Sequence, residues 1–168
     1  NKFRSAHAYT DKVIGDFVAF AKKQPWYDNT LIVILSDHGH RSPKHNGVFN
    51  SPKKFKIPML WLGGALNKKG IEISTIASQV DLPYTLLDLL NTSNREFIFS
   101  KNIFNSSDKQ YAHYIFNKGY GTISKDGVFV YDYMGKKTIL ETGKNTKSLD
   151  SLGKAITQNA FQDFLMRK

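Results

Sequence analysis

The sequence lacks cysteine entirely and contains no long apolar run. Without cysteine the chain forms no disulfide, no thiolate zinc site and no cysteine nucleophile, and both cytosolic and secreted locations stay open. Its longest apolar stretches, residues 31–35 and 59–62, are far shorter than the roughly 20 residues that a membrane-spanning helix needs. No membrane segment is therefore expected within these 168 residues.

Acidic residues are also scarce, since 14 Asp and Glu stand against 24 Lys and Arg, for a net charge of +10. Such an excess of positive charge raises the question of nucleic acid or anionic lipid as a partner. The lysines, however, occur as short pairs at expected turns and element ends, without a long basic run, which is typical of a solvated surface. We expect attraction to anionic substrates, and no nucleic-acid partner.

The first half of the chain has the pattern of a helix followed by buried strands. Apolar residues recur at intervals of three and four from residue 3 to 21 and predict an amphipathic helix that ends before Pro25. Residues 30–35 form a continuous aliphatic and β-branched run, the kind that is buried on both faces of a parallel sheet. Residues 57–62 predict a second buried strand, which Gly63-Gly64 ends, and residues 37–56 between the two predict a long loop.

The second half predicts a helix, a set of short strands and a closing helix. Asp81 is expected to cap the first of these helices, with Pro83 in its first turn. Turn signals then separate four strand-like pieces, which predict an antiparallel meander in which His113 is a packed or surface histidine. The pieces are residues 111–116, 120–124, 128–133 and 138–140. The closing helix, residues 148–166, should bury one apolar side: Leu149, Leu152, Ile156, Ala160, Phe161, Phe164 and Leu165.

These patterns predict an α/β fold in which a mostly parallel sheet lies between helices, followed by a small C-terminal antiparallel β meander and a terminal helix. Residues 1–110 are expected to contain this sheet and its helices. Residues 111–168 are expected to form an antiparallel subdomain with the terminal helix of the same domain.

Asp37 and His38 follow directly on the first buried strand, at its carboxyl end, where open α/β sheets place their ligand sites. A carboxylate oxygen and a neutral imidazole nitrogen suit a divalent cation. Neighbouring side chains on a strand point to opposite faces, so both reach one ion only if the chain bends, which Gly39 permits. An isolated Asp-His pair is more often a capping Asp beside a surface His, so the surrounding sequence decides the interpretation.

That surrounding sequence resembles one family. Residues 27–39, Tyr-Asp-Asn-Thr-Leu-Ile-Val-Ile-Leu-Ser-Asp-His-Gly, resemble the metal-binding strand of the sulfatase and phosphoglycerol-transferase branch of the alkaline-phosphatase superfamily. Residues 9–17 look like the family helix before that strand, and residues 56–59 look like the strand after it. Residues 80–90 resemble its Asp-x-x-Pro-Thr-Leu-Leu segment, with Tyr84 inserted between Pro83 and Thr85. The resemblance covers residues 3–90 well and the remainder weakly.

The resemblance implies an alkaline-phosphatase-like sheet and a divalent metal ion (manganese, zinc, magnesium or calcium) with Asp37 and His38 as ligands. The loop after the pair is most similar to that of lipoteichoic acid synthase-like phosphoglycerol transferases, because His45 stands seven residues beyond His38. It implies substrate-binding roles for His45, Arg41 and His40. Physically, His45 could hydrogen-bond a phosphate oxygen or shuttle a proton, and Arg41 or Lys44 could pair with an anionic head group. A solvated loop histidine and ordinary surface charges are the alternatives.

Family enzymes act through a Thr, Ser or modified nucleophile near the start of the catalytic domain, and none is assignable in this chain. The resemblance therefore implies that residues 1–110 are the C-terminal half of a sulfatase-like catalytic domain, inactive alone, whose missing N-terminal half supplies the nucleophile. Because the sequence begins at Asn1 without Met and without a signal pattern, we expect a processing or proteolysis boundary there. The resemblance implies a phosphoglycerol or related head-group transferase, with a sulfate ester hydrolase as the alternative. The implied substrate is an anionic phospho- or sulfo-ester, either free or lipid-linked. The implied parent protein is membrane-anchored, with this domain outside the cytoplasm. A non-catalytic domain that binds an anionic glycan or lipid is the alternative of another class.

Overall fold

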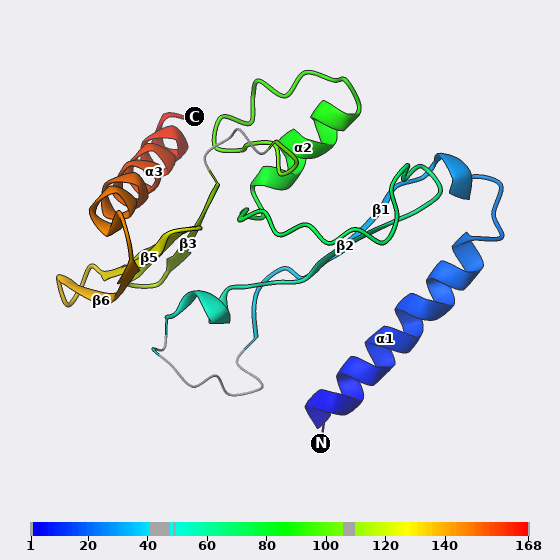
Figure 1. The fold of residues 1–168 in the computed structure, drawn as a ribbon, viewed down its shortest axis with the longest axis horizontal. Coiled ribbons are helices and arrows are strands. Elements are labelled where there is room, and N and C mark those ends of the chain that lie inside the picture. The colour runs from blue at the N-terminus through cyan, green and yellow to red at the C-terminus, as the bar shows by residue number, and fades with distance from the viewer. Residues whose placement is uncertain (1, 41–47, 49, 106–109, 168) are drawn as a thin grey trace. The chain divides into compact units, whose positions relative to one another are not determined.

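The computed structural model describes residues 2–40, 48, 50–105 and 110–167, and these residues contain three α-helices and six β-strands. They belong to two compact units, residues 1–45 with 55–72 and residues 46–54 with 73–168. Figure 1 traces the elements of each unit along the chain. None of the helices in the described part combines the length and apolar character required to cross a bilayer.

The first unit begins with helix α1, Lys2–Ala21, which ends four residues before Pro25, as its sequence period predicts. Ala21 is its buried residue. The rest of its apolar stripe stays largely open, because Val13 and Phe17 are each 46% exposed and Tyr9 is 71% exposed. The short 3₁₀ turn η1, Tyr27–Asn29, then leads into the strands.

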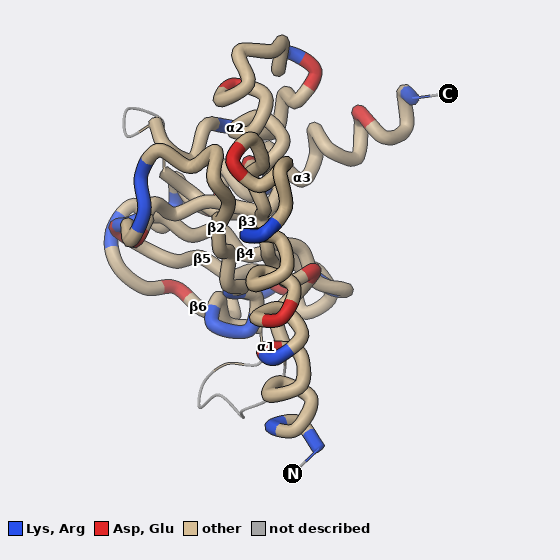
Figure 2. Tube along the Cα trace, turned by 90° about the vertical axis from the view of Figure 1, so that its right-hand side faces the viewer, with Lys and Arg blue, Asp and Glu red and all other residues tan. Residues whose placement is uncertain are grey.

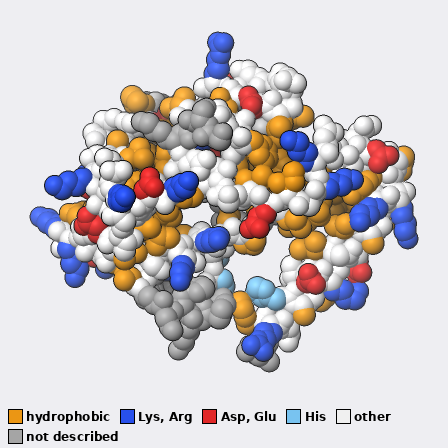
Figure 3. Space-filling model, in the orientation of Figure 1, with side chains coloured by type: hydrophobic (Ala, Val, Ile, Leu, Met, Phe, Trp, Pro, Cys, Tyr) orange, Lys and Arg blue, Asp and Glu red, His pale blue; other side chains and the backbone are white. Residues whose placement is uncertain are grey.

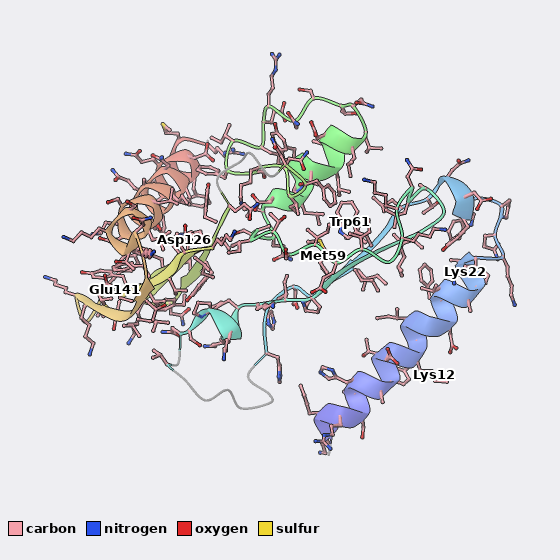
Figure 4. The ribbon with its side chains drawn as sticks, viewed as in Figure 1. Lys12, Lys22, Met59, Trp61, Asp126 and Glu141 are labelled. Carbon is pink, nitrogen blue, oxygen red and sulfur yellow. The ribbon has the colours of Figure 1, made fainter. Side chains whose placement is uncertain are left out.

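Strands β1, Ile32–Leu35, and β2, Met59–Leu62, form a two-stranded sheet and run antiparallel, with Leu35 opposite Met59. Figure 4 labels Met59 and Trp61 on β2. The predicted parallel pairing is therefore wrong for this sheet. Parallel neighbours need a crossover, usually a helix, and the described part of the β1–β2 connection contains only the 3₁₀ turn η2, Pro52–Lys54. The aliphatic run predicts the strand but not its direction. The predicted burial is also wrong, because the residues of β1 are only half-buried and Leu60 of β2 is 51% exposed.

The predicted end of β2 at Gly63-Gly64 is confirmed. Gly63 has a φ of +118°, which L side chains rarely adopt, and a Cβ there would overlap the carbonyl oxygen of Thr30. The backbone N–H of Gly64 donates to the carbonyl of Tyr27 at 3.1 Å. A glycine pair is thus what allows the end of β2 to close against the η1 turn.

The second unit contains helix α2, Asp81–Leu89, whose first residue is a buried carboxylate. The prediction that Asp81 caps this helix is wrong, because Asp81 is helical and its carboxylate points to other partners. It accepts hydrogen bonds from the backbone N–H of Ser78 (2.7 Å) and Lys101 (3.1 Å) and pairs with Lys101 Nζ at 2.5 Å. Lys101 Nζ also lies 4.5 Å from the centre of the Tyr111 ring. This ion pair ties the start of α2 to residues 100–103.

The predicted antiparallel meander is confirmed. Its four strands pair in sequence order, and the β5–β6 register shifts between Val130 and Tyr131. The strands are β3, Tyr111–Phe116; β4, Gly119–Ser124; β5, Gly127–Asp132; and β6, Lys137–Gly143.

Helix α3, Thr146–Met166, closes the chain and contacts β4, β5 and β6. Tyr120 and Phe129 of the sheet and Leu149 of α3 form the buried core between sheet and helix. Of the side predicted to be buried, Leu149 is buried, whereas Phe161, Phe164 and Leu165 are 59 to 74% exposed. Gly153 and Thr157 are the other buried residues of α3. Two small residues of α3 thus lie against the sheet, Gly153 beside Tyr120 and Thr122 and Thr157 beside His113.

Charged side chains are distributed over both units. Figure 2 shows Lys and Arg at many separate points of the chain, with Asp and Glu among them. Figure 3 shows the same mixture on one face, between areas of hydrophobic side chains. This distribution agrees with the solvated surface that the paired lysines indicate, and the expectation of no nucleic-acid partner stays a prediction.

Candidate metal centre after β1

Asp37 and His38 lie in a bend directly after β1, separated from Leu35 by Ser36 alone. The chain leaves the strand geometry at this point, so their side chains are not forced to opposite faces. Asp37 Oδ2 and His38 Nε2 lie 3.4 Å apart. The structure thus brings the side chains of the two predicted metal ligands together. The bend lies at Asp37 and His38 themselves, and not at Gly39, where the sequence analysis expected it.

Two hydrogen bonds orient the pair. The backbone N–H of His38 donates to Asp37 Oδ1 at 2.9 Å. His38 Nδ1 lies 2.9 Å from the carbonyl oxygen of Gly39. Because a carbonyl oxygen only accepts, Nδ1 carries the proton in this contact and the lone pair of the neutral ring is on Nε2. This is the arrangement that metal-binding histidines commonly show, in which the other ring nitrogen donates to a carbonyl or carboxylate.

Asp37 and His38 are suited to supply two of the ligands of a divalent ion. Zinc binds imidazole nitrogen and carboxylate oxygen at about 2.0–2.2 Å, and two such donors at a tetrahedral angle lie about 3.4 Å apart. The side chains of Asp37 and His38 are 85% and 76% exposed, so an ion and an ester substrate can reach them. Within the described ranges, no group of three or more His, Cys, Asp or Glu side chains is placed to hold a metal.

His40, predicted to bind substrate, is exposed, and its ring stacks on Phe3 of α1 with centroids 4.9 Å apart and planes 20° apart. Phe3 also contacts His7, at 4.3 Å between centroids. The structure therefore places His40 against the first turn of α1 and does not bring it into the Asp37–His38 contact. Arg41 and His45, the other predicted substrate-binding residues, lie outside the described residues, as does Lys44.

Sequence reasoning missed the role of Phe3. Its position on the apolar period of α1 predicted only a packed helix residue, and its aromatic partner His40 is 37 positions away in the chain. No short-range signal connects two residues at that separation.

Residues 1–92 match the sulfatase family model. This is more than half of the 168 residues, and the chain belongs to the sulfatase family. The match includes α1, both strands of the first sheet, the Asp37–His38 pair and α2.

Two curated relatives agree with this assignment. Lipoteichoic acid synthase 2 from Bacillus subtilis is 29% identical over 112 residues, which are 60% of this chain and 17% of that protein. Human arylsulfatase K is 26% identical over 85 residues, which are 49% of this chain and 16% of that protein. The chain thus spans about a sixth of the length of these relatives.

A solved structure shares the fold. The crystal structure of a protein in the alkaline phosphatase superfamily from Vibrio parahaemolyticus superimposes with a TM-score of 0.67 at 23% identity, over 92% of this chain and 40% of that one. The predicted fold class, α/β of the alkaline-phosphatase type with a C-terminal meander and terminal helix, is confirmed, with the corrected strand direction in the first sheet.

Proposed function

We propose that this chain is the C-terminal part of a metal-dependent transferase of phosphoglycerol or a related phospho-head-group. The observation that carries the proposal is the 3.4 Å approach of Asp37 Oδ2 to His38 Nε2 after β1, in a chain of the sulfatase family. In this proposal residues 1–110 are part of the catalytic domain and residues 111–168 are a subdomain of it.

Asp37 and His38 supply two ligands of a divalent ion, and upstream residues of the intact protein complete its coordination. When bound, the ion supplies Lewis-acid stabilisation of charge on the transferred group. The hydrogen bond to the Gly39 carbonyl keeps the imidazole lone pair on Nε2, and the backbone N–H of His38 donates to the Asp37 carboxylate. Both metal-binding side chains are therefore oriented before an ion binds. His45, Arg41 and His40 are proposed to bind the anionic ester, and an upstream Thr or Ser is the nucleophile.

A sulfate ester hydrolase is the second candidate, and the match to human arylsulfatase K favours it. The bacterial synthase matches a longer part of the chain at a slightly higher identity, 29% over 112 residues against 26% over 85, and we therefore place head-group transfer first. A non-catalytic domain that binds an anionic glycan or lipid is the candidate of another class. The transferase proposal places the domain outside the cytoplasmic membrane, in a membrane-anchored parent with a lipid-linked substrate.

Replacing either ligand tests the proposal in the intact protein. Asp37→Ala and His38→Ala should each lower kcat/KM by at least about 100-fold, because each removes half of the donor pair. The substrates are p-nitrophenyl phosphate, p-nitrophenyl sulfate and phosphatidylglycerol, and metal content is measured by elemental analysis on the same samples. Preference for phosphatidylglycerol supports the transferase, and preference for the aryl sulfate supports the hydrolase.

Asp16→Ala is the matched control, because Asp16 is an exposed carboxylate whose partner is Lys12, on the same helix. It should leave activity and metal content unchanged. Wild-type activity in both Asp37→Ala and His38→Ala would overturn the metal assignment. An intact protein that turns over none of the three substrates would favour the non-catalytic alternative.

A further inference from the structure

Helix α1 is apolar over about half of its circumference at 3.6 residues per turn, but only one side of this apolar surface is even partly buried. The half-buried or buried side consists of Phe3, Ile14, Val18 and Ala21. The adjacent side, which we call the open stripe, is 46 to 71% exposed and consists of Tyr9, Val13, Phe17 and Phe20. An apolar surface this wide is typical of a helix that is covered on both sides.

The first compact unit buries almost no apolar core of its own. Among its described residues, Ala21 is the only buried hydrophobic residue. In the described part of the chain β1 and β2 pair only with each other, and Leu60 of β2 is 51% exposed. A two-stranded sheet alone is marginally stable in water and needs further strands or a packed helix. The first unit therefore requires a partner that covers its apolar surfaces.

The open stripe has the dimensions to cover a sheet. From Tyr9 to Phe20 it is about 17 Å long, which is the length of a typical strand. In α/β folds, helices bury such stripes against the faces of a mostly parallel sheet. No other helix or strand of the described residues packs along α1, and β1 and β2 do not fill this role. The stripe thus fits a sheet face that these residues do not supply.

The proteins similar to this chain are much longer than the chain itself. It covers 40% of the solved superfamily structure and about a sixth of the length of the curated relatives. We infer that the open stripe docks on a sheet face formed by the upstream half of the intact catalytic domain. The inference rests on the proposed function, which places the missing part of the domain upstream.

Docking of α1 would also hold the candidate metal pair, because α1 is joined to that segment at both ends. At its first turn, Phe3 stacks on His40, two residues after His38. At its other end, α1 continues through η1 into β1, where Thr30 Oγ1 donates to the carbonyl of Trp26 at 2.7 Å. A helix fixed on the upstream sheet therefore keeps the metal pair beside the ligands that the upstream half supplies.

Thiol labelling of the intact protein tests whether the open stripe is covered. Residues 1–168 contain no cysteine, so an introduced thiol is the only one in this part, and the wild-type intact protein gives the background. We expect Val13→Cys, which nearly conserves side-chain volume, to react with a maleimide at least about 50-fold more slowly than Gly15→Cys. Gly15 is the matched control, because it is exposed and a Cβ there meets nothing within 4 Å. Labelling in denaturant confirms that both thiols react.

Photo-crosslinking identifies what covers the stripe. Tyr9→p-benzoylphenylalanine places a photoreactive ring at the most exposed position of the stripe. Irradiation should link it to residues upstream of Asn1 in the same molecule, which peptide mass spectrometry identifies. This measurement also decides the question if Val13→Cys does not fold.

Equal labelling rates of Val13→Cys and Gly15→Cys in the folded protein would overturn the inference. A cross-link to residues 73–168, to a second copy of the protein or to lipid would also overturn it, because each identifies a different occupant. Neither readout depends on activity. Failure here is therefore distinct from failure of the proposed function, which shows as wild-type activity in Asp37→Ala and His38→Ala.

Discussion

At the scale of single residues, His113 shows how neighbours select one form of a side chain. The hydroxyl of Thr157 donates a hydrogen bond to the carbonyl of Gly153 at 2.8 Å. At its 3.2 Å contact with His113 Nε2, the same hydroxyl oxygen therefore accepts a hydrogen bond from the ring N–H. His113 Nδ1 is then the acceptor for the hydroxyl of Thr122, also at 3.2 Å. The neutral ring is satisfied on both sides, as expected of a packed histidine, and burial lowers the pKa of His113 to about 4.

Acid should therefore loosen the contact between α3 and the meander. The unfolded chain binds this proton near pH 6.5 and the folded chain only near 4, so His113 reduces stability as pH falls through this window. The loss between pH 7 and pH 5 should be on the order of 1 kcal/mol, after allowance for solvent near the partly exposed ring. Guanidinium unfolding at pH 7, 6 and 5 measures it. His113→Gln should show a smaller loss over this range, and an equal loss in both proteins would contradict the assignment.

The Asp81–Lys101 pair is the buried ion pair among the described residues, with side chains 1% and 14% exposed. Lys101→Met should lower the free energy of unfolding by about 3 kcal/mol, because it leaves a buried carboxylate with backbone N–H donors alone. Chemical unfolding provides the measurement. In Lys12→Met, which removes a pair whose side chains are 73% and 68% exposed, the change should stay below about 0.5 kcal/mol. Equal effects of the two variants would show that burial of the Asp81–Lys101 pair does not increase its contribution to the free energy of unfolding.

At the scale of elements, α1 and α3 show that period and burial are separate properties. The apolar period of α1 predicts its helix correctly, yet much of its stripe is exposed. In α3 the buried positions include Gly153 and Thr157, which an apolar period does not identify. Gly153 lies against Tyr120 and Thr122 of β4, and the hydroxyl of Thr157 contacts His113 of β3.

Glycine-to-alanine exchanges in the two helices should have opposite signs. Gly153→Ala should destabilise the protein by about 1–3 kcal/mol, because the new Cβ would lie 2.7 Å from Tyr120 Cδ2 and closer still to Thr122 Oγ1. Gly15→Ala should stabilise it by about 0.5–1 kcal/mol, since a Cβ at that exposed position of α1 meets nothing within 4 Å. Thermal and chemical unfolding of both variants decide this. Stabilisation by Gly153→Ala would contradict the packing described for α3.

At the scale of the whole molecule, the family match and the fold match differ in extent. The sulfatase match covers residues 1–92, whereas the structural likeness to the Vibrio parahaemolyticus protein covers 92% of the chain. The fold shared with that protein thus extends into the meander and α3, beyond the part that matches the family model. The chain also spans only about a sixth of its curated relatives, so the activity of an intact protein stays a proposal.

The sequence by itself determined the helices, the meander, the end of β2 and the Asp37–His38 pair, because each depends on residue period, turn chemistry or a short motif. Only the tertiary structure decided the antiparallel direction of β1 and β2 and the contacts of Asp81 with Lys101, of Tyr114 with Asn50 and of His40 with Phe3. The physical reason is the separation of the interacting residues along the chain. Local backbone geometry sets the former, whereas the latter join residues that are 20 or more positions apart and meet only when the chain has packed.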